Sequence, residues 1–105
     1  MRSHYSNSIE DFLNEDRDLI LGKLNRAHSH RHLEIQQTNA WGIQIDLLRE
    51  IFKNNSEGYI FFEFTIPRMG KRVDNIIIIG DLIFVIEFKV GDTKYEKSAV
   101  DQVRL

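Results

Sequence analysis

The chain contains no cysteine and a single proline among its 105 residues. Without cysteine, it can form neither a disulfide framework nor a thiolate metal site. No apolar run reaches the length of a membrane-spanning helix, and the first residues, MRSHYSNSIEDF, lack the apolar stretch of a secretory signal. We therefore expect no membrane insertion and a cytoplasmic location.

The remaining composition is typical of one small folded domain. Hydrophobic residues make up 42% of the chain and seven of them are Phe, which argues against disorder. The net charge of −2 excludes a uniformly basic, nucleic-acid-binding surface. The charges are nevertheless polarised along the sequence. Acidic residues gather near the N-terminus at Glu10, Asp11, Glu15, Asp16 and Asp18, and basic residues gather later at Arg68, Lys71, Arg72, Lys89, Lys94 and Lys97.

Three segments have the residue pattern of helices. Ser8-Ile9-Glu10-Asp11 resembles a capping box that opens a short helix, and a second helix is expected from Asp16 to Arg26. Residues 35–53 form the clearest helix. Its apolar stripe consists of Trp41, Ile45, Leu48 and Phe52, widened by Leu47 and Ile51. We expect residues 1–34 to form an N-terminal helical extension outside the core, and residues 35–105 to form the core domain.

Three later segments have the composition of strands, which predicts an α+β fold with an antiparallel meander. They are residues 59–67, 73–79 and 82–90. Gly80-Asp81 between the last two fits a two-residue type II′ turn. The run from Ile76 to Ile79 has no polar face, so it should be covered on both sides. Helix 35–53 can cover one side, and a helix starting near Lys94 is expected to cover the other.

The turn at Gly80-Asp81 sets a register that brings two carboxylates together. If Ile79 faces Leu82, Asp74 lies opposite Glu87 and Arg72 lies opposite Lys89. Asp74, Glu87 and Lys89 then share one sheet face, with the two carboxylate-bearing Cβ atoms about 4.5–5.5 Å apart. Such a pair repels unless a cation sits between the two groups, and Mg²⁺ and Ca²⁺ prefer oxygen ligands. The alternative is a pair of ordinary salt bridges to Arg72 and Lys89.

Asp74, a hairpin and then Glu87-Phe88-Lys89 resemble the D…(D/E)xK signature of the PD-(D/E)XK nuclease superfamily. The segment GYIFFEFTIPRMGKRVDNIIIIGDLIFVIEFKVG also resembles the nuclease-like region at the N-terminus of some bacterial helicase-type P-loop proteins. This resemblance implies a restriction-endonuclease-like core of helix, three-stranded meander, second helix and further strand. It also implies hydrolysis of nucleic acid, DNA in preference to RNA, with Mg²⁺ or Mn²⁺ as cofactor.

The resemblance implies roles for individual residues. Asp74 and Glu87 would hold the metal, Lys89 would orient the nucleophile, and Gln102 on the second helix would lie near the site. A helix residue before the meander often adds an acidic group, for which the candidates are Gln44, Asp46 and Glu50. Because the final strand of the family fold is missing, we expect a fragment of a longer protein. A helicase-type ATPase, in the same chain or another, and a second copy of this chain are the expected protein partners.

Four more charged residues have two interpretations each. Glu63, a lone charge among aromatic residues, is either a third metal ligand or an ion-pair partner of Arg72 or Lys71. Arg68, Lys71 and Arg72 either bind phosphates beside the site or form an ordinary solvated turn.

His28, His30 and His32 could form a metal cluster, but no carboxylate ligand follows at a defined spacing and Arg31 stands among them. A polar linker between helices is the preferred interpretation.

The expected function is a metal-dependent nuclease. Two alternatives remain open: a catalytically degenerate module that binds nucleic acid or docks onto a partner, and an oligomerisation domain whose apolar strands pair between chains.

Overall fold

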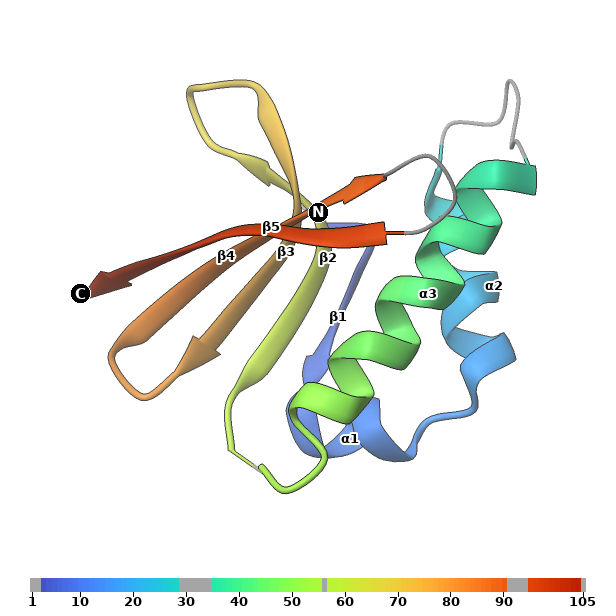
Figure 1. Cartoon of the computed structure of the whole chain (residues 1–105), viewed down its shortest axis with the longest axis horizontal. Coiled ribbons are helices and arrows are strands. Elements are labelled where there is room, and N and C mark those ends of the chain that lie inside the picture. The colour runs from blue at the N-terminus through green and yellow to red at the C-terminus, as the bar shows by residue number, and fades with distance from the viewer. Residues whose placement is uncertain (1–2, 29–34, 56, 91–94, 105) are drawn as a thin grey trace.

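The structure is a computed structural model of the chain that describes residues 3–28, 35–55, 57–90 and 95–104 (Figure 1). For residues 35–36, 89–90 and 95–104 it describes the backbone alone. Three helices and five strands follow the order β1 (Tyr5–Ser8), α1 (Ile9–Asn14), α2 (Arg17–Ala27), α3 (Ile35–Ile51), β2 (Tyr59–Ile66), β3 (Lys71–Ile79), β4 (Leu82–Val90) and β5 (Tyr95–Arg104). The described helices are too short or too polar to span a bilayer.

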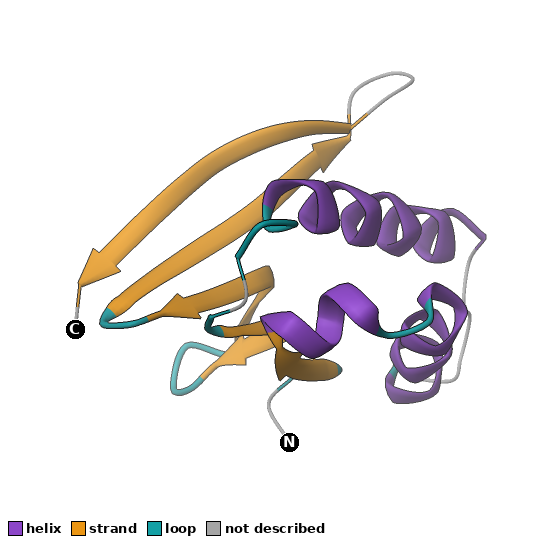
Figure 2. Cartoon of the chain, turned by 90° about the horizontal axis from the view of Figure 1, so that it is seen from below, coloured by secondary structure: helices purple, strands orange, loops and turns teal. Residues whose placement is uncertain are grey.

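The five strands form one antiparallel sheet in the order β1-β2-β3-β4-β5, so every strand pairs with its neighbour in sequence. The three helices lie on one side of this curved sheet (Figure 2). The predicted α+β class with an antiparallel meander is confirmed. The predicted strand number is too small, because β1 and β5 flank the meander.

Local capping explains where the first two helices begin. The Ser8 hydroxyl accepts a hydrogen bond from the Asp11 N–H at 3.1 Å, as the predicted capping motif requires. The Asp16 carboxylate accepts from the N–H groups of Asp18 and Leu19 at the start of α2. These caps satisfy N–H groups that have no partner inside the helix.

A single hydrophobic core joins the helices to the sheet. Its fully buried members are Ile9, Phe12, Ile20, Leu24, Trp41, Ile45, Leu48, Ile60, Phe62 and Ile77. The stripe predicted on α3 therefore faces the core at Trp41, Ile45 and Leu48. Residues from α1 and α2 share that core, and β1 pairs with β2. The segment expected as an external helical extension thus supplies an edge strand and four fully buried side chains.

The alternation of side chains along β2 is interrupted at Glu63. Ile60 and Phe62 point into the core as predicted, but Glu63 adopts a left-handed backbone with φ of 55°. The rings of Phe61 and Phe64 lie 5.6 Å apart, although residues three apart on a regular strand point to opposite faces. Glu63 therefore redirects the strand before it reaches the β2–β3 turn.

The predicted hairpin between β3 and β4 is confirmed. Ile79 pairs with Leu82, and the register continues to Asn75 opposite Ile86. Gly80 has a φ of 61°, while Asp81 is not in the left-handed region, which fits the predicted type II′ turn. Ile77 is fully buried and Ile76 is 8% exposed, whereas Ile78 and Ile79 are partly exposed, so the expected cover on both faces is reached only in the first half of the run.

The helix predicted from Lys94 onward is wrong, because residues 95–104 form β5. This strand pairs with β4 from Leu82 opposite Arg104 to Val90 opposite Tyr95. Lys94 itself lies outside the described residues. The physical reason is the exposed edge of β4, whose backbone donors and acceptors β5 satisfies.

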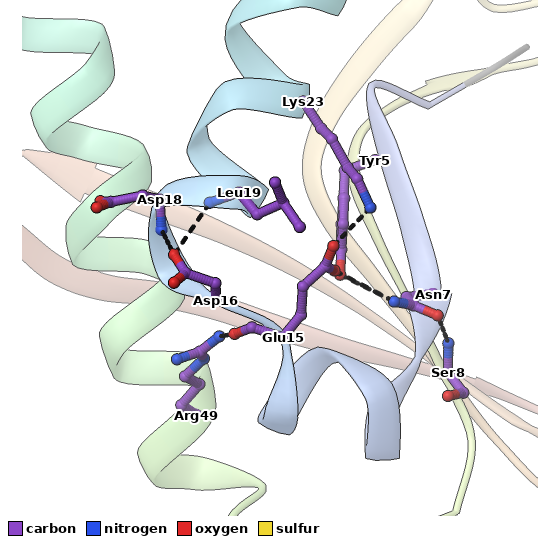
Figure 3. A network of polar contacts seen from close by, with 9 residues as sticks. All are labelled: Tyr5, Asn7, Ser8, Glu15, Asp16, Asp18, Leu19, Lys23 and Arg49. Carbon is purple, nitrogen blue, oxygen red and sulfur yellow. Dashed lines mark hydrogen bonds and ion pairs between the residues drawn. The ribbon is translucent and has the colours of Figure 1, made fainter.

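The corner between β1, α1 and α2 is held by the carboxylate of Glu15 (Figure 3). It accepts hydrogen bonds from the Tyr5 hydroxyl at 2.6 Å and from the Lys23 ammonium at 2.5 Å. The backbone carbonyl of Glu15 accepts a further hydrogen bond from Arg49 on α3. Burial alone would raise the pKa of Glu15, but the hydrogen bonds from Lys23 and Tyr5 lower it on balance.

Replacing Gly58 by alanine should strongly destabilise the fold. Gly58 has a φ of 104°, and a Cβ at this position would collide with the carbonyl oxygen of Ile78 on β3. We expect a loss of roughly 2–4 kcal/mol in the free energy of unfolding, measured by urea denaturation. Gly70→Ala is the matched control, because its φ is 62° and no atom lies within 4 Å of the added Cβ. A cost at Gly58 no larger than at Gly70 would contradict the steric account.

The Glu15→Gln variant should lower stability at neutral pH by about 1–3 kcal/mol, since it removes charged hydrogen bonds from a largely buried group. The pKa of Glu15 is lowered in the folded chain, so this contribution is present above its ordinary value of 4.5 and is lost as pH falls through the folded value. Thermal unfolding from neutral to acidic pH should show the variant and wild type converging. The exposed Glu57, replaced by Gln, serves as control and should show no such gap.

Candidate functional site

Asp74 lies on β3 beside the point where the regular β3–β4 ladder ends. The last paired residues of the ladder are Asn75 and Ile86, so Asp74 and Glu87 follow directly on the two strands. The Asp74 Oδ2 atom accepts a hydrogen bond from the Phe88 N–H at 2.7 Å. Its neighbours on β3, Val73 and Asn75, are buried, and Asp74 itself is partly exposed.

The ladder between β4 and β5 is irregular at the same level. Its register shifts between Ile86 and Phe88, which is the position of Glu87. A bulge of this kind re-aims side chains and bends the strand. Regular strand pairing is therefore interrupted next to Glu87 toward β5 as well as toward β3.

The electrostatics of Asp74 oppose its ionised form. Burial raises the pKa of the Asp74 carboxyl above its ordinary value of 3.8, and the Phe88 N–H partly offsets this by favouring the anion. The negative charges of Glu63 and Glu87 raise the Asp74 pKa further. Carboxylates on the two neighbouring strands thus act on Asp74, and a bound cation would relieve this repulsion.

Glu63 is engaged with other side chains. Its Oε1 atom lies 3.6 Å from an Arg72 guanidinium nitrogen, and its Oε2 atom accepts a hydrogen bond from the Trp41 indole N–H at 3.4 Å. The Glu63 side chain is only 12% exposed. The structure therefore matches the ion-pair interpretation, and a metal-binding role would require Glu63 to leave both partners.

The two remaining residues of the expected signature are described by their backbone only. Lys89 lies on β4, two residues after Glu87. Gln102 lies on β5 and pairs with Phe84, not on a helix as predicted. Phe84 is three residues from Glu87, roughly 10 Å along a strand. The expected position of Gln102 beside the carboxylates is a consequence of the wrong helix prediction and is corrected with it.

Basic residues occupy the turn that connects β2 to β3. Arg68 and Lys71 are exposed, and neither forms a salt bridge with any residue that the structure describes. Arg72 pairs with Glu63 but keeps half of its side chain exposed. Its charge also lowers the pKa of His4, together with burial, the largest cause, and with His28.

The helix α3 does not add an acidic group to Asp74. Asp46 forms a salt bridge with Arg17 at 2.9 Å, and Glu50 forms one with Lys53 at 2.7 Å, both on the exposed side of the helix. Gln44 is 3% exposed, and its carbonyl oxygen finds no hydrogen-bond partner in the described part of the chain.

The histidine segment contributes only one residue to the described structure. His28 follows α2, and its ring packs edge-on against Trp41, with ring centroids 5.6 Å apart. His30 and His32 lie outside the described residues.

Two polar contacts of the site were missed at the sequence level. The first is the hydrogen bond from the indole N–H of Trp41 to Glu63. A fully buried Trp needs an acceptor for this group, and the lone charge of Glu63 among aromatic residues was the signal that could have identified it. Asn75 is also fully buried and donates to the Phe61 carbonyl oxygen at 3.3 Å. Its position before a run of four isoleucines was a further signal of a buried polar group.

The described residues fit one type of metal site and not another. They contain no group of three or more His, Asp or Glu side chains placed to hold a metal ion, which argues against a closed site of the zinc type. Mg²⁺ commonly takes one or two carboxylates and keeps several waters. Asp74 and Glu87 supply two carboxylates on neighbouring strands, next to the last paired residues of the β3–β4 ladder, which is the number that such a site uses.

Comparisons of this chain with protein-family models, with curated proteins and with solved structures find no match.

The Asp74→Asn variant should be more stable than wild type at neutral pH. Because the pKa of Asp74 is raised on folding, the folded chain binds more protons than the unfolded chain, and stability falls as pH rises through that window. Asparagine keeps an oxygen for the Phe88 N–H and removes the buried charge. We expect a higher melting temperature at pH 7, with the gain disappearing below pH 3.8. A melting temperature equal to or below that of wild type at pH 7 would contradict this account.

Proposed function

We propose that this protein is a metal-dependent nuclease module that hydrolyses phosphodiester bonds in DNA. The observation that carries the proposal is the half-buried Asp74, whose carboxylate accepts a hydrogen bond from the Phe88 N–H while the negative charges of Glu63 and Glu87 oppose its ionised form. A fold that retains such a charge at a cost in stability commonly does so for function. The order of α3 and the β2–β3–β4 meander supports the resemblance to the PD-(D/E)XK superfamily in that part of the chain.

In this proposal each residue of the site has a separate role. Asp74 and Glu87 hold a Mg²⁺ or Mn²⁺ ion, which when bound polarises the phosphate and lowers the pKa of a coordinated water. The Phe88 N–H fixes the orientation of the Asp74 carboxylate through Oδ2. Lys89, two residues after Glu87 on the same strand, orients the nucleophile and balances the charge that develops on the phosphate. Arg68 and Lys71 bind the flanking backbone phosphates.

The alternative is a catalytically degenerate module that binds nucleic acid without cleaving it. Two observations favour this alternative. A strand replaces the helix that the superfamily core requires after the meander, and Gln102 on that strand is paired away from the carboxylates. In this case Asp74 and Glu87 would bind metal or a basic partner, and no hydrolysis would occur.

Thermal unfolding with and without Mn²⁺, followed by cleavage of a labelled DNA duplex, tests the proposal. An ion that binds only the folded chain raises stability by about 2.7 kcal/mol at one hundred times its Kd, which is a shift of several degrees in Tm. We expect this shift and metal-dependent cleavage in wild type, and neither in Asp74→Asn or Glu87→Gln.

The matched control is Asp81→Asn, which makes the same carboxylate-to-amide change in the exposed turn of the same hairpin. It should keep both the metal response and the cleavage. A metal response without cleavage would favour the degenerate module. A Tm that is indifferent to metal, or raised equally in the Asp74 and Glu87 variants, would refute the carboxylate site.

A further inference from the structure

The hairpin that joins β2 to β3 forms an arm, residues 64–73, that extends beyond the rest of the sheet (Figure 1). Its strands pair through Phe64 opposite Val73 and Ile66 opposite Lys71. All residues from Pro67 to Arg72 are exposed. The arm is therefore a two-stranded ribbon with a tip that reaches into solvent.

The tip of the arm presents an apolar side chain where folding does not need one. Met69 is 68% exposed, the highest value among the large hydrophobic residues that are described as exposed. Pro67, two residues earlier, is also exposed. Met and Pro are among the residues that proteins insert as wedges between base pairs of duplex DNA.

The backbone of the tip is strained at a charged residue. Arg68 has a φ of 71°, in the left-handed region that favours glycine, directly after Pro67. Proline followed by a residue with positive φ is the pattern of a type II turn, whose second corner is normally glycine. Arginine at this corner costs folding free energy that glycine would not.

The charge of the arm suits a polyanion. Its ten residues include three basic side chains, Arg68, Lys71 and Arg72, and no acidic residue, although the whole chain has a net charge of −2. Pro67, Met69 and Gly70 offer no side-chain donor or acceptor, so only the basic side chains of the arm could contact base edges. The combination fits sequence-independent binding in a minor groove, where a wedge and phosphate contacts suffice.

We propose that the arm enters the minor groove of duplex DNA, with Met69 as the wedge and Arg68 and Lys71 on the phosphates at either side. This proposal rests on the proposed function for its choice of DNA, and it goes further by naming the duplex and the residues that grip it. The arm makes its contacts without metal, so binding can be measured in EDTA, where no cleavage occurs.

Fluorescence anisotropy on the full chain tests the proposal. The labelled probes are a DNA duplex, its single strand and an RNA duplex of the same sequence. Wild type should bind the DNA duplex most tightly, and netropsin, a ligand of A·T-rich minor grooves, should displace it. Met69→Ser should weaken duplex binding roughly tenfold, about 1.4 kcal/mol, and leave single-strand binding unchanged. Equal affinity for the three nucleic acids, or no displacement by netropsin, would overturn the proposal.

The two basic residues have separate controls. Lys71→Gln should reduce the slope of log K against log salt concentration by about one for duplex binding, whereas Lys53→Gln should leave this slope unchanged. Lys53 follows the end of α3 that lies away from the arm, so the pair makes the same chemical change at two places (Figure 1). Arg68→Gly should weaken duplex binding while keeping or raising the melting temperature, because glycine relieves the strained φ. A loss of binding equal in Lys71→Gln and Lys53→Gln would refute the arm as the contact.

Failure of this proposal is distinguishable from failure of the proposed function. Metal-dependent cleavage with duplex affinity unchanged in the Met69, Lys71 and Arg68 variants would leave the nuclease standing and refute the arm. Duplex binding that depends on these residues, with no cleavage in any metal, would support the arm and refute the nuclease.

Discussion

The left-handed backbone at Glu63 is the constraint on which both the core and the arm depend. With a φ of 55° in the middle of β2, it costs about 1–2 kcal/mol for a residue other than glycine. The cost is offset by the contacts that it allows, because the carboxylate meets the Trp41 indole and the Arg72 guanidinium. Before Glu63, β2 contributes Ile60 and Phe62 to the core. After it, the chain leaves the core and forms the arm.

The same residue connects the core to the candidate site. The charge of Glu63 raises the pKa of Asp74, so the ion pair of Glu63 with Arg72 also moderates the repulsion that Asp74 experiences. If Arg72 moved to a phosphate, Glu63 would lose its cation and the negative charge around Asp74 would be less well compensated. A divalent cation between Asp74 and Glu87 would then bind more favourably. Phosphate binding and metal binding are thus expected to be cooperative in the proposed function.

Local signals in the sequence predicted much of this fold. Ser8 and Asp16 identified helix starts, and Gly80-Asp81 set the register of the β3–β4 hairpin. The prediction was wrong for residues 95–104, because whether that segment pairs with β4 depends on the exposed edge of β4, a tertiary property that no local pattern records. The positive φ of Glu63 and the Phe88 N–H bond to Asp74 were not predictable either, since a strand pattern assumes regular alternation.

Strand β3 sets the distance between the arm and the carboxylates. Asp74 lies five positions after Met69, so an extended chain places them at most about 17 Å apart. One turn of B-form DNA rises about 34 Å, so a tip seated in the minor groove leaves Asp74 within half a turn of the same duplex. Met69 lies in the turn, and β3 runs without interruption from Lys71 through Arg72 to Asp74. In the proposed function, a duplex bound by the arm would lie close to Asp74, which favours cleavage near the point of insertion.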